Sequence, residues 1–148
     1  MFMGEKYQER LTDHSRRVIK ECLNIIEVYG DTYVAIHRDE ETECVILVTV
    51  MRSVPLLSII FAEELAFKNR SDPGLLLVIN DMNTSSITGW HAASLGGDSV
   101  LYMYRQCIRL TMELSYEVLF QLLKEGISEY KEGKRRIMTS SCPATPAG

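Results

Sequence analysis

The chain has 148 residues, of which 46% are hydrophobic and 24% charged, and its formal net charge at pH 7 is −4. This length suits one domain with its own core, and the composition argues against wholesale disorder or a membrane protein. Positive and negative residues are interspersed, which argues against the basic stripe of a nucleic-acid-binding protein.

The longest apolar runs, such as Cys44 to Met51, are far shorter than the roughly 20 residues needed to span a bilayer. Met1 leads directly into charged sequence and not into a signal peptide. The four cysteines never cluster with a histidine at zinc-ligand spacing. We therefore expect a cytoplasmic protein with no metal, no cofactor, no nucleic-acid partner and no membrane partner.

The first half of the chain predicts a helix followed by strands. After an N-terminal segment of residues 1–10, apolar residues recur at helical spacing from Leu11 to Tyr29, and Gly30 is expected to end that helix. Residues 33–38 and 43–51 indicate a hairpin, and residues 56–61 a third strand. Residues 62–70 fit a strand or a helix equally well.

The second half predicts a short helix, a hairpin and a long helix. Ser71-Asp72-Pro73 is a helix start, and residues 75–83 follow as an apolar helix. Residues 87–94 and 99–110 indicate two strands joined by a tight turn over residues 95–98. Ser115 is expected to cap a final helix that Gly133 ends, and residues 139–148 are expected to be a disordered tail.

These elements predict a single α+β domain over residues 11–138. Its antiparallel sheet of about five strands is flanked by helices, in the order α-β-β-β-α-β-β-α.

The sequence contains no recognisable catalytic motif. His91, beside Trp90, is the histidine that best suits a base or a ligand, but no second histidine or carboxylate is placed to orient it, which favours a structural role. Asn80 and Asn83 can face the same way on the short helix, and a cap or a polar contact with backbone is favoured over ligand binding. A small-molecule-binding or enzymatic domain that uses His91, Trp90, Asn80 and Asn83 is the alternative function.

The strand over residues 99–110 is apolar on both faces near its turn. Tyr102 and Tyr104 share one face, and Leu101 and Met103 share the other. One face is expected to pack under the helices, and the other to meet a further element or a partner subunit. Trp90, Tyr102 and Tyr104 are therefore candidates for a protein-interaction or dimer surface, although core packing explains the two tyrosines equally well.

The order of elements resembles the type III secretion chaperone-like fold. Residues 75–83, Gly89-Trp90, the Gly-Gly-Asp turn and residues 100–104 resemble the YbjN family of candidate bacterial sensory transduction regulators. The resemblance covers roughly residues 12 to 132. It implies a non-enzymatic protein that forms a homodimer and binds an unidentified protein partner, with a regulatory or chaperone-like role.

Overall fold

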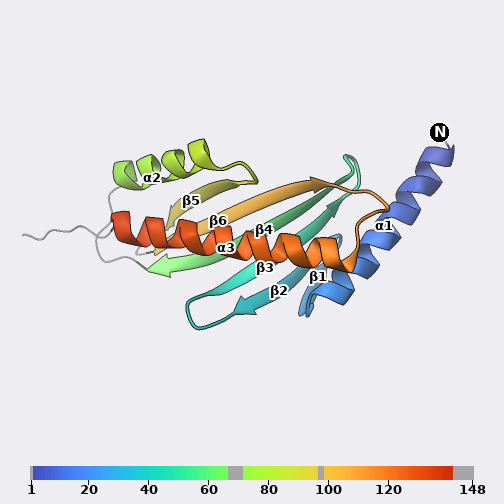
Figure 1. The fold of residues 1–148 in the computed structure, drawn as a ribbon, viewed down its shortest axis with the longest axis horizontal. Coiled ribbons are helices and arrows are strands. Elements are labelled where there is room, and N and C mark those ends of the chain that lie inside the picture. The colour runs from blue at the N-terminus through green and yellow to red at the C-terminus, as the bar shows by residue number, and fades with distance from the viewer. Residues whose placement is uncertain (1, 67–71, 97–98, 142–148) are drawn as a thin grey trace, which may run out of the picture.

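The computed structural model describes residues 2–66, 72–96 and 99–141 (Figure 1). These residues form elements in the order α-β-β-β-β-α-β-β-α. The elements are α1 (Phe2–Cys22), β1 (Glu27–Tyr29), β2 (Thr32–Arg38), β3 (Glu43–Met51), β4 (Leu56–Ala66), α2 (Asp72–Ser85), β5 (Trp90–Gly96), β6 (Ser99–Arg109) and α3 (Tyr116–Ser141). The predicted α+β class is confirmed, with six strands in place of about five.

The strands form one sheet in the spatial order β1-β2-β3-β4-β6-β5, and every neighbouring pair is antiparallel. The helices pack against the same face of this sheet, which we call the inner face. Figure 1 shows α3 running across the sheet, with α2 beside β5 and α1 at the opposite end. The other face of the sheet is called the outer face.

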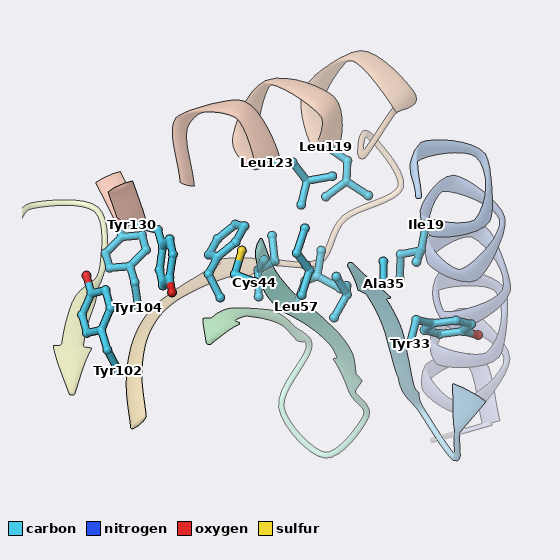
Figure 2. Packing of buried hydrophobic residues seen from close by; sticks show 14 of the residues in the cluster. Ile19, Tyr33, Ala35, Cys44, Leu57, Tyr102, Tyr104, Leu119, Leu123 and Tyr130 are labelled. Atoms are coloured by element: carbon cyan, nitrogen blue, oxygen red, sulfur yellow. The ribbon is translucent and has the colours of Figure 1, made fainter. Parts of the chain in front are cut away.

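The core lies between the inner face and the helices, because alternate strand residues point toward the helices. Tyr102, Tyr104, Tyr130 and Phe61 are the largest side chains with no exposed surface. Their rings lie within 5.0 to 6.3 Å of a neighbouring ring, so this end of the core is aromatic (Figure 2). Toward α1 the core contains Ile19, which is fully buried, with Tyr33 of β2 beside it (Figure 2).

The first helix differs from its predicted bounds at both ends. It begins at Phe2, within the segment that we set apart as N-terminal, and ends at Cys22. Residues 27–29, predicted as helix, form the edge strand β1, and the Ile26 amide donates to the Val34 carbonyl at 2.8 Å. Gly30 does end this segment, but as the turn into β2 at φ 58°. Branched apolar residues near Ile26 suit an edge strand as well as a helix.

The uncertainty over residues 62–70 is settled in favour of a strand as far as Ala66. Residues 62–66 of β4 pair with residues 99–103 of β6, and this pairing overrides their helix-forming composition. Residues 67–70 lie outside the described residues.

The second half contains two further differences. The strand predicted from residue 87 begins at Trp90, and in the turn predicted over 95–98 the first two residues belong to β5. Gly97 and Asp98 lie outside the described residues. Ser115 caps α3 as predicted, since its hydroxyl accepts from the Val118 amide at 3.2 Å.

Gly133 does not end α3, which continues to Ser141. Residues 139–141, predicted as part of a disordered tail, are therefore helical, and residues 142–148 lie outside the described residues. The glycine serves packing and not termination: a Cβ at this position would lie 2.0 Å from the Tyr102 hydroxyl oxygen.

Candidate functional site

The surroundings of His91 determine whether this histidine can act as a base or a ligand. His91 projects from β5 onto the inner face and is 5% exposed. Its Nδ1 lies 2.7 Å from the Tyr102 hydroxyl oxygen, and its ring lies 4.7 Å from that of Tyr104. Gly133 of α3 packs against the same ring. The imidazole is thus enclosed by a hydroxyl, two aromatic rings and a helix backbone.

Burial lowers the pKa of His91 to about 4, with a smaller contribution from the positive charge of Arg136. The ring is therefore neutral at pH 7. Within the described part of the chain, Tyr102 is its one hydrogen-bond partner, and burial raises the pKa of that phenol. No described carboxylate bonds to the ring to orient it as a base, so the geometry is that of a satisfied core histidine.

A small hollow of about 250 Å³ opens beside this histidine. Its lining mixes α2, α3 and His91, and includes Ser85, Ser86, Glu129, Glu132 and Arg136. The Arg136 guanidinium already forms an ion pair with Asp81 of α2. The hollow therefore lies where two helices are tied together above the end of the sheet.

Asn83 and Asn80 differ in their contacts and their exposure. The Asn83 side chain accepts from the His91 amide at 2.6 Å and donates to the His91 carbonyl at 2.9 Å. Asn80 is exposed, and its backbone carbonyl accepts from the Thr84 hydroxyl. The polar contact with backbone that the sequence favoured is thus what Asn83 makes. The structure does not bring Asn80, Asn83, Trp90 and His91 together around one cavity.

The three candidates for an interaction surface are divided between the two faces of the sheet. Tyr102 and Tyr104 have no exposed surface and lie under the helices, where the Tyr104 hydroxyl contacts the Thr88 hydroxyl at 2.8 Å. The core alternative therefore holds for both tyrosines, and neither reaches a surface. Trp90 lies on the outer face and is 45% exposed, with the Arg105 guanidinium 5.3 Å from its ring centre.

The outer face carries apolar side chains from five strands, and the helices of the described residues all lie on the opposite side. We call this set the outer patch. It consists of Ile36, Val45, Leu47, Ile60, Leu101, Met103 and Trp90, all of them exposed or half-buried. Leu101, on the face of β6 opposite the two tyrosines, is 40% exposed. Contiguous apolar surface of this kind is typical of an interaction site.

Opposite charges border the outer patch at its two ends. Glu64 of β4 lies at one end, beside Leu101, and accepts from the Ser99 hydroxyl at 2.6 Å. Arg109 of β6 lies at the other end, opposite Leu56. The two ends are eight residue steps apart along β4, from Leu56 to Glu64, which corresponds to about 27 Å along the sheet.

Sequence reasoning did not find a second apolar surface, which lies on the inner side beside α3. Phe120 and Lys124 line a hollow there of about 490 Å³, together with Ile46 of β3 and the end of α1. Phe120 falls outside the apolar face that helical periodicity assigns to α3. The sequence feature that could have indicated this surface is Phe120 itself, an aromatic residue on the polar face of an amphipathic helix.

The described residues offer neither a grouped set of metal ligands nor a helix that could cross a membrane. Among the described residues, no three histidine, cysteine, aspartate or glutamate side chains are grouped so as to hold a metal ion. Within the same residues, no helix has the length and apolar character required to cross a bilayer.

Comparisons with known proteins show the fold. No protein-family model matches the chain, and no curated protein matches it. The structure of YbjN from E. coli, described as a candidate transcription regulator, aligns with a TM-score of 0.55 and 10% identity over 86% of this chain and 89% of that one. A chain of the HopA1–SchA chaperone–effector complex aligns with a TM-score of 0.51 and 16% identity over 92% of this chain and 97% of that one. The fold of this chain is therefore the type III secretion chaperone-like fold, as its order of elements predicted.

Proposed function

We propose that this chain is a non-enzymatic, homodimeric protein-binding module with a regulatory or chaperone-like role. The observation that carries the proposal is the outer patch, an apolar sheet face without a helix of the described residues over it. The two structural neighbours, a candidate transcription regulator and a member of a chaperone–effector complex, support a role of this class. One fold can carry many functions, and the role of a protein depends on its sites and surfaces.

A second copy of the chain is the partner that the outer patch fits. A two-fold axis that lies between two stacked sheets and runs perpendicular to their strands reverses the direction of the strands in the second copy, so that the Glu64 end of one sheet faces the Arg109 end of the other. The apolar side chains around the axis then face one another, and opposite charges meet at both margins. Arg105 lies opposite Ile60 in this central row, where it donates to the Ser58 hydroxyl and lies over the Trp90 ring.

Sedimentation velocity tests this arrangement. At tens of micromolar, the wild-type chain is expected to sediment as a dimer and Leu101→Arg as a monomer, because position 101 faces the Arg109 end of the second copy and the new cation meets a like charge there. Ile87→Arg is the matched control, since Ile87 is 97% exposed and outside the outer patch. A wild-type monomer, or a Leu101→Arg dimer, contradicts the proposed arrangement.

A charge exchange tests the pairing of the two ends. Glu64→Arg and Arg109→Glu, made singly, are each expected to weaken the dimer because like charges then face each other across the contact. The double exchange is expected to restore most of the loss, because the opposite charges meet again. Dimer dissociation constants measured by sedimentation equilibrium give the coupling directly.

A further inference from the structure

Two neighbouring hollows on the inner side of the molecule follow α3. Its first part, about 490 Å³, has Ile46 and His37 of the sheet as its floor and Cys22 and Leu23 at the end of α1 as one wall. The α3 side is formed by Phe120, Leu123, Lys124, Ile127, Ser128 and Lys131. Most of these side chains are apolar, so this part of the hollow offers a site to an apolar ligand.

A second hollow of about 320 Å³ adjoins the first at Lys131, which lines both. It extends along α3 to Met138 and Thr139, beside Glu41 and Thr42 of the β2–β3 turn. We call the two hollows together the α3 groove. From Phe120 to Thr139 the groove follows α3 for about 28 Å, at 1.5 Å of rise per residue. A hollow of this length accommodates a peptide segment better than a compact small molecule.

The charged residues that line the α3 groove are mostly cationic. They are Lys124, Lys131, Lys134 and Arg135, with Glu41 as the one carboxylate among the lining residues. Three of these cations already pair with carboxylates of the chain: Lys131 with Asp39, Lys134 with Glu63, and Arg135 with Glu41 and Glu132.

Lys124 differs from these three. In the described part of the chain it pairs with no carboxylate, and its ammonium lies 5.8 Å from the ring centre of Phe120. Phe120 in turn stacks on Tyr116 one turn earlier, at 5.7 Å. An exposed aromatic pair and a cation without an acidic partner therefore border the apolar part of the groove. A ligand carboxylate beside Phe120 can therefore form an ion pair with Lys124.

We infer that the α3 groove binds an apolar peptide segment of a partner protein, and that a carboxylate of this segment pairs with Lys124. The inference rests on the proposed protein-binding function and names the chemistry of the partner. The groove and the outer patch lie on opposite sides of the sheet, so that dimerisation and peptide binding use separate surfaces.

Fluorescence anisotropy with labelled amphipathic peptides tests the inference. The probe is a peptide of about 19 residues in which leucines form one helical face and glutamates the other, long enough to follow the groove. The matched probe replaces every glutamate with lysine. The wild-type chain is expected to bind the acidic peptide about tenfold more tightly or better. Equal affinity for the two peptides, or tighter binding of the lysine peptide, overturns the inference.

Three variants locate the site. Lys124→Glu is expected to weaken binding of the acidic peptide about fivefold, and Phe120→Ala about tenfold, because each removes one of the two groups that border the groove. Lys6→Glu makes the same charge change at an exposed residue far from the groove and is expected to bind as wild type does. If Lys6→Glu weakens binding as much as Lys124→Glu does, the contact is a general charge effect and the inference fails.

Sedimentation of the same samples separates this inference from the proposed dimer. A wild-type dimer that binds neither peptide contradicts the groove and leaves the dimer intact. A monomer that binds the acidic peptide at the groove contradicts the dimer arrangement alone.

Discussion

Gly133 is the residue on which the packing of α3 against the aromatic end of the core depends. A methyl group at this position would lie 2.0 Å from the Tyr102 hydroxyl and 3.0 Å from the His91 ring, both held in the core. Gly133→Ala is therefore expected to lower the free energy of unfolding by about 1 to 3 kcal/mol, even though alanine favours a helix. Urea unfolding measures the change. Gly4→Ala, in the open first turn of α1, is the control and is expected to cause no loss.

His91 is expected to make stability depend on pH. Its folded pKa of about 4 is below the unfolded value of 6.5, so the unfolded chain binds more protons between these two values. The contribution of the buried neutral ring is complete above pH 6.5 and is lost as the pH falls toward 4, by about 2 kcal/mol at pH 5.

Urea unfolding at pH 7 and pH 5 checks this prediction. His91→Gln is expected to show a smaller loss between the two pH values than the wild type does. An equal loss in both proteins would assign the pH dependence to groups other than His91.

At the scale of the element, the end of α3 gives a matched pair of truncations. Ile137 is fully buried, whereas Met138 is 40% exposed and Thr139 is exposed. Removal of residues 139–148 is expected to leave the melting temperature unchanged, as the sequence predicted for this tail. Removal of residues 137–148 is expected to lower it by about 5 °C or more, because a fully buried side chain is lost. Differential scanning calorimetry distinguishes the two, and a large drop in the shorter truncation would show that the tail is docked.

The elements that the sequence predicted well are those with strong local signals. Asp72-Pro73 and Ser115 mark the starts of α2 and α3, and alternation marks the long strand β6. The weaker predictions failed where tertiary contacts determine the structure. The segment before Gly30 forms β1 because it can pair with Val34 of β2. Gly133 lies inside α3 and not at its end, because a larger side chain there would collide with Tyr102. Neither contact can be inferred from the local sequence.

The candidate site was predictable to a similar extent. The sequence indicated that one face of β6 is buried and the other is available, but could not assign the faces, because both are apolar near the turn. The structure places the tyrosines inside and Leu101 outside. The α3 groove depends on the distance between the end of α1 and α3 across the sheet, which no local pattern specifies.

At the scale of the whole molecule, the single tryptophan of the chain reports on the outer patch. Because Trp90 is 45% exposed there, a face-to-face contact would remove water from its ring. The fluorescence emission is expected to shift to shorter wavelength as the concentration rises through the dimer dissociation constant. Leu101→Arg is expected to show no shift. A spectrum that is independent of concentration in a protein known to dimerise would place the contact elsewhere.

The pair of hydrogen bonds from Asn83 has a consequence for solubility. β5 is an edge strand, and the amide and carbonyl of one strand residue point to the same side, so those of His91 that Asn83 occupies point away from β6. The asparagine side chain thus imitates a neighbouring strand at the place where a foreign chain would add to the sheet. An unprotected edge invites such addition and leads to aggregation. The contact between Asn83 and His91 therefore protects this edge of the sheet against strand addition, while the outer patch stays available for the proposed dimer.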